Sequence, residues 1–169
     1  MPLAIRPAGP DDVAAVADVL AEGSAWLQSK GIAQWPARFS ADFLLGYVQR
    51  GELYAATEGG DVVGTVTLQW SDTPFWGDRQ DAGFVHRLAM RRSHTGSGRA
   101  LLDWAEGQVV AKGRSFLCLD TLSSNTRLRR YYEDLGFRPV GEISGPAEHP
   151  TDPVLGEWRA TLYEKAVLK

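Results

Sequence analysis

Residues 84–102 join an apolar run to a turn rich in arginine, serine and glycine, and then to an amphipathic segment. The run from Phe84 to Met90 is typical of a buried strand, and apolar residues recur at helical spacing from Gly98 to Lys112. Glycines in such a turn let a ligand approach the backbone, and the first amides of a helix lack partners within it. The helix dipole adds a partial positive charge, so the stretch predicts an anion-binding loop, although glycines also serve simple turns.

The charge around this loop is positive, although the chain as a whole is acidic. With 18 Lys and Arg against 21 Asp and Glu, the net charge is −3. No acidic residue lies between Asp81 and Asp103, and this segment holds four arginines: Arg87, Arg91, Arg92 and Arg99. Such a field favours a phosphate-bearing ligand. The segment contains neither the P-loop motif nor the full Gly-x-Gly-x-x-Gly fingerprint, so kinase-like and Rossmann nucleotide sites are disfavoured.

The composition is that of a globular chain with one hydrophobic core. At 169 residues, with 44% hydrophobic and 23% charged residues, the chain is large enough to fold without disulfides or metals. The acidic net charge argues against nucleic acid as a partner, and no apolar run approaches the roughly 20 residues that cross a bilayer. Cys118 is the only cysteine, which excludes an internal disulfide and gives no familiar metal site. These features predict a metal-free cytoplasmic protein with no membrane partner.

Glycine and proline separate short segments that alternate between strand-like and helical patterns, which predicts an α+β fold with helices covering a mixed sheet. A helical pattern begins at Asp11 and breaks from Trp26 to Phe39, and the segment from Ser71 to Asp81 is expected to be an aromatic loop. The proline-containing segment after Ile143 is expected to be an exposed connection. Further helices are expected to begin at Ser40, Gly98 and Asn125, and strands at residues 3–6, 53–57, 62–70, 84–90, 116–122, 139–143 and 157–163.

Three stretches together resemble the GNAT superfamily of acetyl-CoA-dependent N-acetyltransferases: residues 85–90, residues 98–106, and residues 119–137 with Asn125 and the run Tyr131-Tyr132-Glu133-Asp134-Leu135-Gly136-Phe137. The resemblance covers nearly the whole chain and implies a single GNAT domain over residues 1–169. Its fold would be a mostly antiparallel twisted sheet of about seven strands flanked by about four helices. It implies an acyltransferase that uses acetyl-CoA as co-substrate and no metal. Dimers are common in the family, so a homodimer is one further expectation.

The resemblance assigns the cofactor to particular residues. The pantetheine arm would pair with the backbone of Leu88, Ala89 and Met90. Asn125 matches the family asparagine that reaches the cofactor, with capping of its own helix as the alternative role. The family's basic position falls on Ser93 or Thr95 according to register, so neighbouring arginines, Arg91, Arg92 and Arg99, would supply the charge. The diphosphate would sit on the amides of Gly96, Ser97, Gly98, Arg99 and Ala100.

The chemistry of acetyl transfer needs an acid, a base and an oxyanion partner. Tyr132 matches the family tyrosine that protonates the departing sulfur, and Tyr131 occupies an aromatic packing position; alternatively, both tyrosines only pack the helix. Strand alternation would place His86 on the same face as Leu88, which makes His86 the candidate general base unless it is a core histidine. A backbone amide near Met90 would hold the oxyanion. Glu22 and Asp81 stay open as alternative bases.

The acceptor site is the least specified part of the sequence. Aromatic residues in two variable segments, above all Trp35, Trp70 and Trp76, are expected to line it, although Trp35 and Trp70 could equally close the core. Such a lining favours an acceptor with apolar or aromatic bulk, or a cationic amine. With the resemblance, it implies a primary amine of a small molecule, attacked directly without an acyl-enzyme on Cys118. Two alternatives stay open: a non-catalytic acyl-CoA-binding sensor, and an acetyltransferase acting on protein amino termini or lysines. A basic helix face of Arg127, Arg129 and Arg130 would serve solubility or the cofactor's third phosphate.

Overall fold

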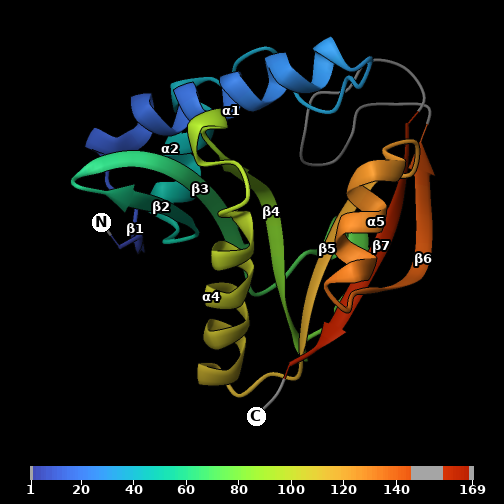
Figure 1. Ribbon diagram of the computed structural model, residues 1–169. Helices are drawn as coiled ribbons and strands as arrows, with labels where there is room; N and C mark the ends of the chain where they lie inside the picture. The colour runs from blue at the N-terminus through green and yellow to red at the C-terminus, as the bar shows by residue number, and fades with distance from the viewer. Residues whose placement is uncertain (1, 146–157, 168–169) are drawn as a thin grey trace. The chain divides into compact units, whose positions relative to one another are not determined.

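The computed structural model describes residues 2–145 and 158–167 (Figure 1). Its strands are β1 Ala4–Pro7, β2 Leu53–Glu58, β3 Asp61–Gln69, β4 Ala82–Met90, β5 Phe116–Leu122, β6 Arg138–Gly145 and β7 Trp158–Ala166. Its helices are α1 Val13–Ser29, α2 Ala41–Gln49, α3 Thr73–Trp76, α4 Gly98–Ala111 and α5 Thr126–Asp134, with 3-10 turns η1 Pro10–Asp12 and η2 Arg92–His94. The hydrogen-bonded strand order is β1-β2-β3-β4-β5-β7-β6. The pair β4–β5 is parallel, and the pairs β1–β2, β2–β3, β5–β7 and β6–β7 are antiparallel.

This architecture confirms the predicted α+β class and the seven mostly antiparallel strands. Two details of the sequence prediction are wrong. The helix α1 does not break at Trp26 but continues to Ser29, and it ends where Gly31 adopts a φ of 77°. There the amides of Gly31 and Ile32 turn back to the carbonyls of Gln28 and Leu27, both at 2.9 Å, which is a glycine-based helix stop. The segment expected to be a loop contains the short helix α3, which brings the number of α-helices within the described residues to five.

The chain forms two compact units, which are described separately. Unit 1 comprises Met1–Leu68 and His86–Trp104, and unit 2 comprises Gln69–Val85 and Ala105–Lys169. Strand β4 contributes residues to both, so the expectation of one domain over the whole chain stays a prediction. The predicted exposed connection after Ile143 lies largely outside the described residues, as does the first residue of the last predicted strand, Glu157. None of the described helices is long and apolar enough to cross a membrane.

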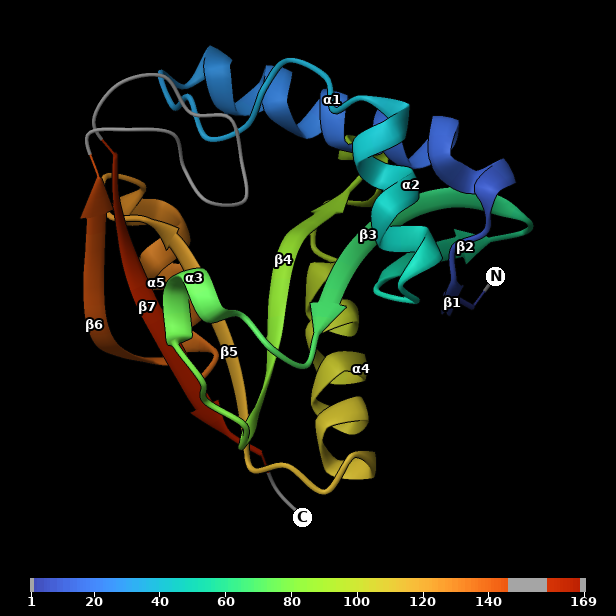
Figure 2. The same cartoon turned by 180° about the vertical axis from the view of Figure 1, so that it is seen from behind.

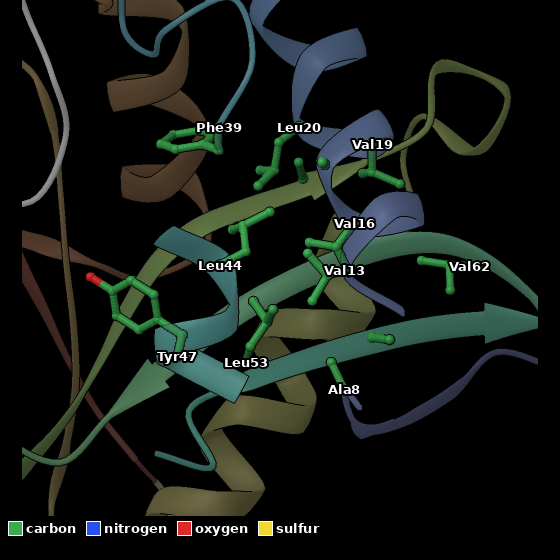
Figure 3. Packing of buried hydrophobic residues seen from close by; sticks show 13 residues of the cluster. Ala8, Val13, Val16, Val19, Leu20, Phe39, Leu44, Tyr47, Leu53 and Val62 are labelled. Atoms are coloured by element: carbon green, nitrogen blue, oxygen red, sulfur yellow. The ribbon is translucent and has the colours of Figure 1, made fainter. Parts of the chain in front are cut away.

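The core of unit 1 lies between two helices and the strands beneath them (Figure 3). Helix α1 buries the predicted face, and helix α2 adds Leu44 and Tyr47 above Leu53 of β2. Each such side chain contributes about 1.5–3 kcal/mol when fully buried. The predicted N-cap of α2 is confirmed, because the amide of Phe43 donates to Ser40 Oγ at 3.1 Å. The buried α1 residues are Val13, Val16, Ala17, Val19, Leu20 and Ser24.

In unit 2, strands β5, β7 and β6 carry helices on opposite faces. Figure 1 shows α5 in front of these strands, and Figure 2, from behind, shows α3 on the other side. The Tyr163 hydroxyl of β7 reaches α5, where it donates to Glu133 and accepts from Arg129 Nε, both at 3.0 Å. On the α3 face, Phe75 packs edge-on against Trp158 at 6.1 Å between ring centroids. Alternation along β7 therefore determines which helix each side chain meets.

Glu164 of β7 is a buried carboxylate held by two arginines. Its side chain is 8% exposed. Its Oε2 lies 2.7 Å from Arg79 Nη2, and its Oε1 lies 2.7 Å from Arg138 Nη2. Arg79 also stacks on the Phe116 ring at 4.9 Å and is 22% exposed, whereas Arg138 is 73% exposed. Burial alone would raise the pKa of Glu164, but the hydrogen bonds from Arg79 and Arg138 outweigh it, so its pKa lies below the ordinary value.

We expect Glu164→Gln to lower the free energy of unfolding at pH 7 by about 1–3 kcal/mol, because it removes the buried one of the two carboxylates that pair with the mostly buried Arg79. A lowered carboxyl pKa stabilises the fold above the unfolded-state value of 4.5, and that contribution is lost as pH falls through the folded-state pKa. Urea unfolding at pH 7 and at about pH 3 should therefore show wild type and variant converging in acid. Arg138→Ala is the control and should cost less than about 1 kcal/mol, because solvent screens that pair. A difference that stayed constant with pH would contradict this account.

Candidate active site

Strand β4 carries the residues that the sequence assigns to the cofactor, and it is not a regular strand. Arg87 has a φ of 47°, the only positive φ of a non-glycine residue in the described part of the chain. Such a conformation is sparsely populated outside glycine and interrupts the extended backbone. The alternation used to place His86 and Leu88 on one face therefore does not hold across Arg87. Nothing in the sequence signals this interruption, because arginine has no preference for positive φ.

Arg87 also differs from its expected role as part of the loop's positive charge. The residue is 4% exposed, and its guanidinium lies over two rings of α2, 4.5 Å from the centroid of Tyr47 and 5.2 Å from that of Phe43. Cation–π contacts of this kind stabilise a desolvated guanidinium. Arg87 therefore packs β4 against α2 within unit 1, and its charge is directed to those rings.

The end of β4 is tightly packed against β3. A Cβ placed on Gly64 of β3 would collide with Met90 Sδ and lie 3.1 Å from the carbonyl oxygen of Ala89. A larger residue at this position would require the Met90 side chain to move and the Ala89 carbonyl to shift by a few tenths of an ångström. Gly64 thus helps to determine the position of two of the three residues predicted to pair with pantetheine.

The turn between β4 and α4 offers free backbone donors. Gly96 has a φ of 99°, a conformation that favours glycine. The amides of Ser97 and Ala100 are used inside the loop, where they donate to the carbonyls of His94 and Ser97 at 3.1 and 3.0 Å. Backbone hydrogen bonds of the described loop leave three of the five predicted diphosphate donors without an acceptor: the amides of Gly96, Gly98 and Arg99. Together with the start of the 14-residue helix α4, these amides fit an anion such as a diphosphate.

Two of the arginines expected to supply charge to this loop are held elsewhere. Arg91 Nε donates to the Val62 carbonyl at 3.1 Å, and its NH1 lies 3.3 Å from Glu22 Oε2. The Arg92 guanidinium lies 4.1 Å from the centroid of the Trp26 ring. Both arginines are therefore engaged within unit 1, and electrostatic compensation by Arg91, Arg92 and Arg99 stays a prediction. Arg99 in the first turn of α4 is exposed.

The alternative bases are also engaged in these contacts. Glu22 accepts the Arg92 amide at 2.6 Å in addition to its ion pair with Arg91. In unit 2, Asp81 pairs with Arg79 Nε at 2.6 Å. Neither arrangement supports a role as general base. His86 is buried in unit 1, and its assignment as the base stays a prediction.

Tyr132 and Asn125 both lie in unit 2. Tyr132 is 7% exposed, with its ring edge-on to Phe137 at 5.7 Å, whereas Tyr131 is 38% exposed. Tyr132, not Tyr131, is therefore the tyrosine that packs. Burial, together with the neighbouring Tyr131 and Asp120, raises the pKa of Tyr132 above its ordinary value, so the phenol keeps its proton at neutral pH. Asn125 caps α5, because its Oδ1 accepts the Leu128 amide at 3.2 Å, which confirms the capping alternative without testing contact with a cofactor.

The three tryptophans predicted to line the acceptor site have different surroundings. Trp35 belongs to unit 1, where its ring meets Phe39 edge-on at 6.3 Å and packs against the core. In unit 2, Trp70 lies beneath the cations of Lys112 and Arg114, at 5.2 and 5.5 Å. Trp76 of α3, also in unit 2, stacks on Phe84 at 5.8 Å and on Arg79 at 5.3 Å, and its buried indole Nε1 has no hydrogen-bond partner in the described structure. A shared lining by the three stays a prediction.

Comparison with known proteins identifies the class to which this chain belongs. The model of the acetyltransferase (GNAT) family matches residues 20–137, more than half of the chain. The chain therefore belongs to this family, as the sequence motifs predicted, and is an acyltransferase of the N-acetyltransferase type. In sequence it is similar to the uncharacterized N-acetyltransferase YesJ of Bacillus subtilis (strain 168), with 24% identity over 147 residues, 80% of this chain and 81% of YesJ.

Solved structures share the fold. A GNAT-family acetyltransferase from Listeria monocytogenes 4b F2365 matches with a TM-score of 0.74 and 23% identity, over 97% of this chain and 94% of that one. The protein yncA from Salmonella typhimurium, solved with its cofactor acetyl-CoA, matches with a TM-score of 0.70 and 19% identity, over 100% and 96%. The PaiA N-acetyltransferase from Thermoplasma acidophilum, in complex with coenzyme A, matches at 0.69 and 18%, over 98% and 99%. At these identities the likeness establishes the GNAT fold alone.

Proposed function

We propose that this acyltransferase moves an acetyl group from acetyl-CoA to a primary amine of a small molecule by direct attack. The observation that carries the proposal is the set of three backbone amides without acceptors, those of Gly96, Gly98 and Arg99, at the start of α4. Membership of the family gives the reaction class. Relatives of the same fold, yncA and PaiA, were solved with acetyl-CoA and coenzyme A, respectively.

The chain's own residues fit a CoA thioester as donor. We assign pantetheine to the backbone of Leu88, Ala89 and Met90, and the diphosphate to the loop from Gly96 to Ala100. Gly64 of β3 permits the close packing of Ala89 and Met90 against that strand. Acetyl-CoA supplies an acyl carbon that an amine can attack without prior activation. A backbone amide near Met90 is assigned to the oxyanion. Asn125 is assigned to the cofactor in addition to its capping role.

Proton transfers are assigned to two side chains. Tyr132 donates its phenolic proton to the departing sulfur, and its raised pKa ensures that this proton is present across the physiological range. His86 accepts a proton from the ammonium form of the acceptor, so that the neutral amine attacks. Cys118 is fully buried, and burial raises the pKa of its thiol to about 12, which argues against a covalent acyl-enzyme.

Calorimetric titration with acetyl-CoA, followed by thiol release against small amines and peptides, tests the proposal. We expect micromolar binding and turnover on at least one small amine, with the tryptophans Trp35, Trp70 and Trp76 contributing to acceptor affinity. Turnover on peptides alone would replace the acceptor class with protein amino termini or lysines. Binding without turnover on any acceptor would indicate a sensor, and no binding would reject the assignment of the loop. The cytoplasmic location and the homodimer stay predictions.

A further inference from the structure

We propose that Glu22 of α1 is a positioning residue for the anion-binding loop, acting through the backbone of Arg92 and not on the reacting atoms. The inference rests on the proposed function, since it assumes that the loop from Gly96 to Ala100 holds the diphosphate of acetyl-CoA. It concerns contacts that all lie within unit 1.

Glu22 reaches the first residues after β4, although it is 70 positions away from Arg92 in the sequence. Its Oε1 accepts the Arg92 amide at 2.6 Å, and its Oε2 lies 3.3 Å from Arg91 NH1. One helical turn further along α1, Trp26 lies 4.1 Å beneath the Arg92 guanidinium. Two residues on one face of α1 therefore hold the main chain and the side chain of the same loop residue.

The position of Arg92 propagates along the loop through consecutive turns. Its carbonyl accepts both the amide and the hydroxyl of Thr95, at 3.4 and 2.7 Å. The carbonyl of His94 then accepts the Ser97 amide at 3.1 Å, next to Gly96. On the other side, His94 Nε2 lies 3.0 Å from Glu58 Oε2 at the end of β2. The base of the loop is thus fastened on two sides, while the amides of Gly96, Gly98 and Arg99 stay available.

The negative charge of Glu22 distinguishes a role in positioning the loop from a role in attracting the anionic ligand. A carboxylate close to a diphosphate site opposes anion binding, and its ion pair also offsets the charge of Arg91. The benefit of Glu22 must therefore come from its hydrogen bond to the Arg92 amide. A neutral side chain of the same length with an oxygen acceptor should replace it, and a side chain without an acceptor should not.

The test compares Glu22→Gln, Glu22→Ala and, as a matched control, Asp18→Ala. Asp18 lies one turn earlier on α1 in an exposed ion pair with Arg38, so its loss removes the same charge without touching the loop. The measurements are the affinity for acetyl-CoA by calorimetry, hydrogen exchange of the Arg92 amide by NMR, and KM and kcat. We expect Glu22→Ala to weaken acetyl-CoA binding about tenfold, to raise KM by a similar factor with kcat nearly kept, and to lose protection at Arg92.

In the same experiment, the affinity of Glu22→Gln for acetyl-CoA should lie within about twofold of the wild-type value or above it. The affinity of Asp18→Ala should not differ from that of wild type. Equal affinity in Glu22→Ala and wild type would overturn the inference. Equal weakening in both Glu22 variants would show that the charge, not the acceptor, is required. Loss of kcat in both at unchanged affinity would make Glu22 the general base instead. A wild-type protein that does not bind acetyl-CoA would reject the proposed function itself, which this series distinguishes from a failure of Glu22.

Discussion

Tyr132→Phe is expected to lower turnover by about ten- to a thousandfold while acetyl-CoA affinity stays close to the wild-type value. The substitution removes one hydroxyl and keeps the ring that packs against Phe137 and Tyr163. It deletes the proposed proton donor of the departing thiolate and leaves the proposed diphosphate loop unchanged. Thiol release under saturating substrates gives kcat, and calorimetry on the same preparation gives the affinity.

Tyr131→Phe is the matched control, because the neighbouring tyrosine is exposed and has no assigned role in the chemistry. It should retain wild-type turnover. The pH profile adds a second readout: since the pKa of Tyr132 is raised, no loss of kcat due to this residue should appear below about pH 10. Unchanged turnover in Tyr132→Phe would remove the tyrosine from the mechanism and leave it as a packing residue only.

Local sequence patterns predicted most of the fold, because each acts over a few residues. Apolar spacing located the buried face of α1, Ser40 identified the N-cap of α2, and β5 has the predicted bounds. The end of α1 was placed too early because the whole stretch from Trp26 to Phe39, which contains Gly31 and Pro36, was assigned to the break, whereas the helix continues to Ser29 and stops at Gly31. Within that stretch the glycine, and not the first residue, marks where the helix ends.

Only the part of the candidate site that lies in local sequence motifs could be predicted. The motif around Gly98 located the loop and its donors, since glycine and a helix start are visible in sequence. The partners of its arginines were not, because they depend on residues distant in the chain: Arg92 meets Glu22 and Trp26 of α1. The buried, positive-φ Arg87 was missed for a similar reason, since its conformation is stabilised by packing and not by its own preference.

The strongest test of the loop exploits two opposite effects of one charge. At the start of α4, Gly98→Asp places an acid where the helix dipole favours it, so the free energy of unfolding should stay unchanged or rise by up to about 1 kcal/mol. In the proposed site the same acid would face the diphosphate, so acetyl-CoA binding should weaken about a hundredfold, or about 3 kcal/mol. Thermal unfolding and calorimetry on one preparation separate the two effects.

Gly107→Asp on the same helix is the control, because a Cβ there meets nothing within 4 Å and the residue lies outside the loop. It carries the same added charge and should bind acetyl-CoA as wild type does, although an acid at this position lacks the favourable dipole interaction of the helix start. Equal affinities in Gly98→Asp and wild type would remove the loop from the cofactor site. A loss of affinity in both variants would mean that the added charge acts at long range. A direct contact with the diphosphate would weaken binding only in Gly98→Asp.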